Sequence, residues 1–220
     1  MPTLRSLLFA LLVLAAFCAE AQIFSPTTRP TATQERRMRV LWWNVENLFD
    51  TLHDAGFDDR EFLPESDRRW TSSRYWHKQG ALARVIVAAG GMQPVDVVGM
   101  CEVENDSVLR DLTRRSLLRT ARYEYVMTHS PDLRGIDVAL LYSPFTFALV
   151  KSYALRVNPL AGMRPTRDIL YAKGVRAGGD TLHIFVIHAP SRAGGEANTR
   201  PYRVAVAQRL CNAIDSIRRE

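Results

Sequence analysis

Residues 40–50 read VLWWNVENLFD, an apolar run that turns polar within one strand length. Val40–Val45 has the β-branched and aromatic composition of a buried strand, and Asn44 lies near its end. Val95–Glu102 repeats the pattern, since a second apolar strand closes on the carboxylate of Glu102. A carboxylate on an apolar face costs several kcal/mol unless it is paired, bound to a metal or able to reach a cleft. The ends of these two strands are therefore the first places to look for chemistry.

Apolar periodicity places further elements around these strands. Ser73–Ala89 has apolar residues at helical spacing and stops at a glycine pair, which predicts a helix between the two strands. A second helix is expected over Ser107–Arg119 with Asp106 or Ser107 as its cap, and a last one begins near Pro201. Between them we expect the strands Tyr125–His129, Asp137–Tyr142, Phe145–Tyr153, Ile169–Val175 and Thr181–His188, the last two joined as a hairpin at 177–180.

This order of elements predicts an α/β layered protein with a mixed sheet. The alternation is not the regular one of a dinucleotide-binding fold, and the chain has no GxGxxG, P-loop or HExxH motif. Trp42 and Trp43 are expected in the core, and the polar stretch 50–72 is expected to be a long loop. The last helix has an apolar stripe of Ala207, Leu210, Cys211, Ile214 and Ile217.

Composition and charge exclude several classes of protein. The 220 residues are 47% apolar and 24% charged, which excludes a disordered, collagen-like or coiled-coil chain. The net charge of +6 suits an anionic partner, although solubility accounts for most of the basic residues. These residues form no continuous stripe, which disfavours a dedicated nucleic-acid-binding module. We expect Cys101 and Cys211 to be buried free thiols, so that disulfides do not hold the fold.

The N-terminus has the pattern of an export signal. Residues 1–21 combine an early arginine, a short apolar run and a small-x-small site, which predicts cleavage after Ala21. Lipid anchoring at Cys18 is disfavoured by the bulky Phe17 before it. Residues 22–38 are rich in Pro, Ser and Thr and predict a flexible tether. No later segment is apolar over about 18 residues, so we expect a secreted or periplasmic protein with no transmembrane segment in the mature chain.

Two groups of residues have functional chemistry. Asn44 and Glu102 offer amide and carboxylate oxygens, the hard ligands that Mg²⁺ prefers. The alternative is that they only cap strands or bond loop amides. His188 ends an apolar strand and is followed by a loop with Ser191, Arg192 and two glycines. Backbone amides and a guanidinium can bind an anion there, and His188 can donate a proton or a hydrogen bond. The alternative is a hairpin-exit loop with a surface histidine.

Four segments occur in an order that resembles the endonuclease/exonuclease/phosphatase superfamily, which has the deoxyribonuclease I-like fold. The resemblance extends from about Arg39 to the end of the chain. The loop between Asp58 and Tyr75 is similar to that of an exported or cell-envelope bacterial branch. The four segments are WNVENLFD at 43–50, CEVEN at 101–105, RGIDVALLY at 134–142 and HAPSR at 188–192.

The resemblance implies a four-layer α/β/β/α sandwich of two mixed sheets that uses Mg²⁺ or Mn²⁺. It implies that Glu102 binds the metal, that Asn44 lies near the metal and the scissile phosphate, and that His188 contacts the phosphate and protonates the leaving group. Glu104 is the rival to Glu102, and we expect it to anchor a loop instead. Weaker candidates for phosphate binding or support are Arg134, Asp137, Arg167, Ser191 and Arg192.

The family's later Gly-Asp-x-Asn and Ser-Asp-His motifs are absent from this sequence. Residues 39–220 are therefore expected to form the N-terminal two-thirds of such a domain, with a second sheet that is incomplete at its C-terminal end. The predicted function is a secreted phosphoester hydrolase of the phosphodiesterase or endonuclease type, in which a metal-activated water attacks phosphorus. The alternative is a truncated, inactive member that binds an anion or a partner. We expect a phosphoester substrate, with nucleic acid among the possibilities, and a monomeric chain.

Overall fold

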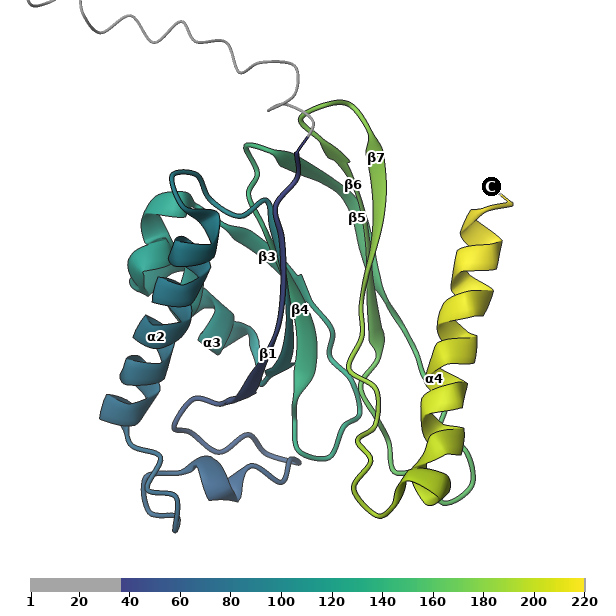
Figure 1. Ribbon diagram of the computed structural model, residues 1–220. Coiled ribbons are helices and arrows are strands. Elements are labelled where there is room, and N and C mark those ends of the chain that lie inside the picture. The colour runs from purple at the N-terminus through teal and green to yellow at the C-terminus, as the bar shows by residue number, and fades with distance from the viewer. Residues whose placement is uncertain (1–36, 220) are drawn as a thin grey trace, which may run out of the picture. The chain divides into compact units, whose positions relative to one another are not determined.

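The computed structural model describes residues 37–219, which form two packed sheets with helices on their outer faces (Figure 1). The first sheet has the strand order β1-β2-β4-β3 and the second has the order β5-β6-β7. Helices α2 and α3 cover the outer face of the first sheet, and α4 covers the outer face of the second. The expected four-layer α/β/β/α arrangement is confirmed.

The first sheet is mixed, as predicted. Its strands are β1 (Val40–Leu48), β2 (Val97–Val103), β3 (Glu124–Met127) and β4 (Asp137–Tyr142). β1 runs parallel to β2, whereas β4 is antiparallel to both β2 and β3. The inner strands β2 and β4 are almost wholly buried, which explains their near-continuous apolar sequences.

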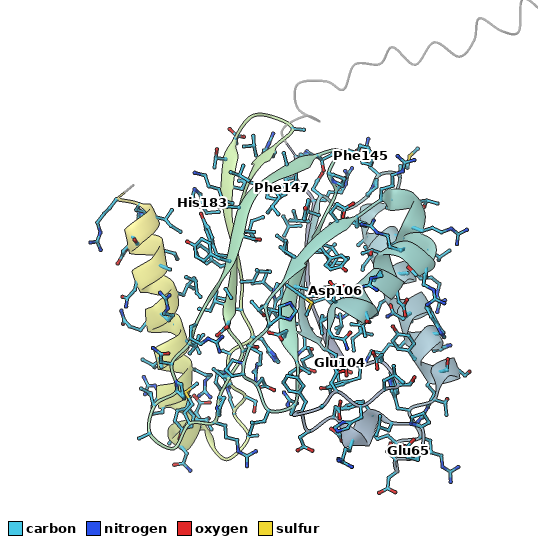
Figure 2. The ribbon with its side chains drawn as sticks, turned by 180° about the vertical axis from the view of Figure 1, so that it is seen from behind. Glu65, Glu104, Asp106, Phe145, Phe147 and His183 are labelled. Atoms are coloured by element: carbon cyan, nitrogen blue, oxygen red, sulfur yellow. The ribbon has the colours of Figure 1, made fainter. Side chains whose placement is uncertain are left out.

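The second sheet departs from the prediction. Its strands are β5 (Phe147–Leu155), β6 (Ile169–Arg176) and β7 (Thr181–Val186), and within residues 37–219 both of its pairings are antiparallel. The sheet is not mixed there, because successive strands return directly on each other and the predicted hairpin joins the last two. β5 begins later than predicted, since exposed Phe145 lies in the preceding turn while Phe147 is buried between the sheets (Figure 2).

The helices differ from the prediction mainly in the second one. α2 (Ser72–Gly90) ends at Gly91 with φ 65, as a glycine stop requires. The single helix expected over 107–119 is instead α3 (Asp106–Arg110), a π-turn (Asp111–Arg115) and a 3-10 turn (Leu117–Ala121). The Asn105 side chain caps α3, accepting from the N–H of Ser107 at 2.9 Å. Ser116, in an extended conformation, separates the π-turn from the 3-10 turn.

Three apolar layers hold the elements together. One lies between α2, α3 and the first sheet, one between the sheets, and one between the second sheet and α4 (Glu196–Ile217). Trp43 packs in the first layer, but Trp42 is 57% exposed, so its expected place in the core is wrong. Trp42 lies on the opposite face of β1, beside Gly99, and β1 is an edge strand of the described sheet.

The packed face of α4 is shifted from the predicted stripe. Val206 and Ala213 are its buried residues, with Tyr202, Leu210 and Ile217 packed beside them. Ala207 and Cys211 are exposed, so Cys211 is not the buried thiol that was expected. Cys101 is buried and free, and burial is the main cause that raises the pKa of its thiol to about 12.

The predicted signal peptide and most of the predicted tether, residues 22–36, lie outside the described residues. Met38, at the end of the predicted tether, already packs against the layer between the sheets. Within residues 37–219, none of the helices has both the length and the apolar character needed to cross a bilayer.

Candidate active site

The site begins where β1 leaves the sheet. The pairing of β1 with β2 shifts register between Asn44 and Leu48. Inside this bulge Glu46 and Asn47 have left-handed backbones, with φ of 56 and 60. Non-glycine residues in that region cost about 1 kcal/mol or more each and concentrate at functional sites. The bulge carries the polar end of β1 toward the loops at one end of the sandwich.

Glu102 lies on β2 directly beside this bulge. Its Oε1 accepts from Nδ2 of Asn44 at 3.0 Å, and its Oε2 accepts from the N–H of Asn47 at 2.9 Å. Its own φ is 64, so the register of β2 also shifts at this residue. The structure therefore brings Asn44 and Glu102 together and fixes both carboxylate oxygens of Glu102.

His188 reaches the same point from the second sheet. It lies two residues beyond β7, and its Nε2 is 3.4 Å from Oε1 of Glu102. Its Nδ1 is buried and has no hydrogen-bond partner among the described residues. Burial, and next the Arg167 guanidinium, lower the pKa of His188 to about 4. Without a ligand the ring is therefore neutral at pH 7, and in this state it can donate a hydrogen bond; its predicted proton transfer to a leaving group stays a prediction.

Arg167 fixes the backbone at His188. Its guanidinium is buried and pairs with Asp132 at 2.9 Å. It also donates to the carbonyl oxygens of His188 and Ala189 at 3.0 and 3.1 Å. The two terminal nitrogens of Arg167 are thus engaged by protein oxygens, and the residue has a structural role. Asp132 was missed from the sequence because it sits in an ordinary Pro- and Gly-containing turn with nothing to mark it.

A cavity of about 510 Å³ opens beside Glu102 and His188. Arg134, one of the predicted phosphate ligands, lines it with a half-exposed side chain, and Ser191 lines it as well. Arg164, exposed and not predicted, lies on the same wall. The cavity is also lined by Thr166, Arg167 and Tyr202. It is therefore lined by Glu102 of the first sheet, by loops that flank the strands of the second sheet and by α4. Guanidinium groups such as those of Arg134 and Arg164 can pair with an anion.

Three buried polar atoms along this cavity lack a partner within residues 37–219. They are Nδ1 of His188, Nε of Arg167 and Oγ1 of Thr166. Buried polar atoms are nearly always bonded to protein or to water, and each exception calls for an explanation. Their grouping on one cavity fits a place where water or a ligand supplies the missing bonds.

Two predicted phosphate ligands are placed elsewhere. Asp137 is buried at the start of β4 and accepts from Oγ1 of Thr128 at 2.5 Å and the N–H of Ser130 at 3.1 Å. Burial raises its pKa, and its role is to shape the loop that leads to the cavity. Arg192 is exposed and pairs with Glu196 at 3.0 Å. Neither side chain faces Glu102, so Asp137 supports the site and Arg192 lies at its margin.

Glu104, the rival to Glu102, anchors the long acidic loop as expected. Its Oε2 accepts from the N–H of Asp50 at 2.6 Å. Burial, and then the charges of Asp50, Asp54 and Asp59, raise its pKa to about 9 despite that bond. Figure 2 shows Glu104 enclosed among other side chains, whereas Glu65 of the acidic loop points outward. Glu104 is therefore a neutral structural residue at pH 7.

The donor set at Glu102 fits Mg²⁺ rather than a metal held by a complete protein cage. Within the described residues, no group of three or more His, Cys, Asp or Glu side chains could hold a metal. The site offers one carboxylate, Glu102, on an open cavity. The Asn44 amide lies beside it, with its nitrogen toward Glu102 and its oxygen accepting from the N–H of Glu46. Mg²⁺ keeps several waters and binds through one or two carboxylates together with substrate phosphates. The residues present match that mode of binding.

Comparisons with known proteins agree with the fold. Residues 39–220 match the model of the Endonuclease/Exonuclease/phosphatase family. A search of curated proteins gives no match. Similar solved structures include a conserved protein of unknown function from Enterococcus faecalis, at 15% identity and TM-score 0.55, covering 81% of this chain and 61% of that one. A second is a mannosyl-6-phosphatase from Bacteroides thetaiotaomicron, at 15% identity and TM-score 0.54, covering 82% of this chain and 60% of that one. A third is the human nocturnin catalytic domain with bound sulfate, at 18% identity and TM-score 0.51, covering 81% of this chain and 59% of that one.

Sequence identities this low show a shared fold and nothing more. The chain spans about six-tenths of the length of each of these structures, at 61%, 60% and 59%.

Proposed function

The chain belongs to the endonuclease/exonuclease/phosphatase family, and on that premise we propose that it is a metal-dependent phosphoester hydrolase. One observation carries the proposal. Glu102 and His188 lie 3.4 Å apart on the wall of one cavity, and Asn44 lies 3.0 Å from Glu102. A polar constellation of this kind in a concave site is typical of catalysis.

Glu102 and Asn44 are the residues that would hold Mg²⁺ or Mn²⁺. Such an ion supplies charge neutralisation for the phosphate and lowers the pKa of the attacking water. Arg134 lies on the cavity wall and can pair with a non-bridging phosphate oxygen. The bonds from Asn44 and Asn47 keep the Glu102 carboxylate oriented before substrate arrives.

His188 changes its role when an anion binds. In the free protein it is neutral, and its Nε2–H can donate to a phosphate oxygen. A bound phosphate favours the charged imidazole, so it opposes the effects of burial and of Arg167 and raises the pKa of His188. The ring can then protonate the departing oxygen. Arg167 keeps the ring in place through the His188 carbonyl.

Substrate choice follows from the cavity. A volume of about 510 Å³ is in the range of small-ligand sites, so a small phosphoester or the end of a nucleic acid strand fits it. The acidic loop 50–67 repels a long polyanion, which favours the small substrate. A phosphodiester, nucleic acid included, remains within the proposal. Secretion or a periplasmic location, and a monomeric state, are likewise proposed from the sequence.

The second candidate is an inactive family member that binds an anion or a partner. One observation favours it. Within the described residues, its candidate metal site has a single carboxylate. Arg134 and Arg164 would then bind an anion in the cavity without any reaction.

Variant kinetics on bis-p-nitrophenyl phosphate with Mg²⁺ or Mn²⁺ test the two candidates. Glu102→Gln keeps the size and hydrogen-bond acceptor of Glu102 but loses its charge, so we expect it to abolish metal-dependent turnover. His188→Ala should lower the rate by about two to four powers of ten, as for loss of an acid or charge stabiliser.

Two results would contradict these assignments. Full turnover by Glu102→Gln at saturating Mg²⁺ removes Glu102 from the site. A loss below about tenfold in His188→Ala makes His188 structural. Absence of turnover in folded parent protein supports the anion-binding candidate, which binding of inorganic phosphate then checks.

A further inference from the structure

Lys78 of α2 is bonded to the backbone bulge of β1. Its Nζ donates to the carbonyl oxygens of Glu46 and Asn47, the latter at 3.2 Å. These are the two consecutive left-handed residues, with φ of 56 and 60. Non-glycine residues in that conformation persist only where surrounding contacts hold them. One ammonium group therefore secures both strained residues from the helix side.

The same bulge presents its N–H groups to the site. The N–H of Asn47 donates to Oε2 of Glu102, and the N–H of Glu46 donates to Oδ1 of Asn44, both at 2.9 Å. The carbonyl of Glu46 and the N–H of Asn47 belong to one peptide unit, which is planar and turns as a rigid plate. Lys78 donates to the carbonyl oxygen of this peptide unit, and the N–H of the same unit donates to Glu102.

We propose that Lys78 is a positioning residue for Glu102. It fixes the peptide between Glu46 and Asn47, and that peptide orients the Glu102 carboxylate for the metal. The inference rests on the proposed function, because it concerns the metal ligand assigned there. Groups that orient a metal ligand commonly change metal affinity by about ten- to a hundredfold when they are removed.

Lys78 acts through Glu102 and is not itself placed to touch the substrate. It lines a different cavity, of about 370 Å³, together with Trp70, Arg74 and His77. Its half-buried ammonium lies 5.7 Å from the centre of the Trp70 ring, which restricts its position further. A residue that contacted substrate would be expected on the larger cavity, where Glu102 and His188 lie.

Mn²⁺ affinity, measured without substrate by electron paramagnetic resonance, tests the inference. Lys78→Met keeps the aliphatic stem and removes the donors, and we expect it to weaken Mn²⁺ binding about tenfold. Lys151→Met on β5 is the matched control, since that lysine is exposed and its Nζ lies 5.9 Å from the Tyr153 ring. The control should leave affinity unchanged, and Lys78→Arg, which keeps N–H donors, should recover part of it. Excess Mn²⁺ should also restore the hydrolysis rate of Lys78→Met.

The outcomes separate this inference from the proposed function. Equal Mn²⁺ affinity in folded Lys78→Met and parent protein overturns the inference and leaves the function standing, even if the melting temperature falls. Parent binding that Glu102→Gln does not remove overturns the proposed function and this inference with it. Should Lys78→Met fail to fold, Lys78→Gln is measured in its place, and the same two results decide.

Discussion

At the scale of single residues, His188 is the side chain whose state most affects the account. It is held between the Arg167 guanidinium, which disfavours its charged form, and the Glu102 carboxylate, which favours it. Burial has the largest effect of the three and leaves the ring neutral. A neutral ring at 3.4 Å leaves the negative charge of the Glu102 carboxylate uncompensated, and a bound metal ion requires that charge. A bound anion would favour the charged ring and raise the pKa of His188.

Titration of the His188 ring by NMR in EDTA tests this state. We expect a pKa near 4 in the folded protein, below the ordinary 6.5. Because the unfolded chain takes up this proton first, His188 stabilises the fold fully above pH 6.5, and that contribution is lost as pH falls toward 4. His188→Gln should flatten stability over this window. A folded-state pKa of 6 or higher would contradict the described surroundings of the ring.

The sequence could reveal some of the site residues and not others. Asn44 and Glu102 could be predicted because each interrupts an apolar strand, where burying a polar group costs free energy unless it is paired. Lys78 and Asp132 could not, since one lies on a polar helix face and the other in a common turn. Their roles depend on groups far away in the sequence. Lys78 meets backbone carbonyls 32 and 31 positions away, and Asp132 meets a guanidinium 35 positions away.

At the scale of elements, the pairing of β5 with β6 depends on a glycine. A Cβ added at Gly174 would lie 2.2 Å from the ring of Phe147, which is fully buried between the sheets. Gly80 in α2 is the opposite case, because its nearest contact is the flexible Arg84 side chain at 3.4 Å. The two glycines therefore predict opposite responses to the same substitution.

Chemical denaturation of Gly174→Ala and Gly80→Ala measures this difference. Gly174→Ala should lower the free energy of unfolding by about 1–3 kcal/mol, because the Phe147 ring must move in a packed layer. Gly80→Ala should raise it by about 1 kcal/mol, because alanine favours the helix. Stability of Gly174→Ala at or above that of the parent protein would show that the two sheets pack more loosely than described.

Helices and strands with a regular spacing of apolar residues were predicted well. Those whose ends are set by hydrogen bonds from side chains to nearby backbone were not. α2 and the strand β4 lie within about a residue of their predicted bounds. The helix expected over 107–119 breaks because Ser116 is extended and its hydroxyl accepts from the N–H of Leu118. The stripe on α4 was predicted in part. Leu210 and Ile217 pack against the second sheet, but Val206 and Ala213 are buried there whereas Ala207 and Cys211 are exposed.

At the scale of the whole described domain, the site depends on how the two sheets are packed. Figure 1 shows the loops after β1 and β7 at the same end of the sandwich. Glu102 comes from one sheet and His188 from the other, so the packing of the sheets fixes the 3.4 Å between them. The exposure of Trp42 could not be predicted from the sequence, because it depends on the place of its strand in the sheet. Within residues 37–219, β1 pairs with β2 alone, and Trp42 on it is 57% exposed.

The most direct test of the central claim is hydrolysis of bis-p-nitrophenyl phosphate in ¹⁸O-labelled water, followed by mass spectrometry. With Mg²⁺ or Mn²⁺ we predict release of p-nitrophenol, with the label in the p-nitrophenyl phosphate product, because water attacks phosphorus. EDTA and Glu102→Gln should each abolish the reaction. Folded protein without turnover, or turnover unaffected by both EDTA and Glu102→Gln, would contradict the claim that Asn44, Glu102 and His188 form a metal-dependent phosphoesterase site.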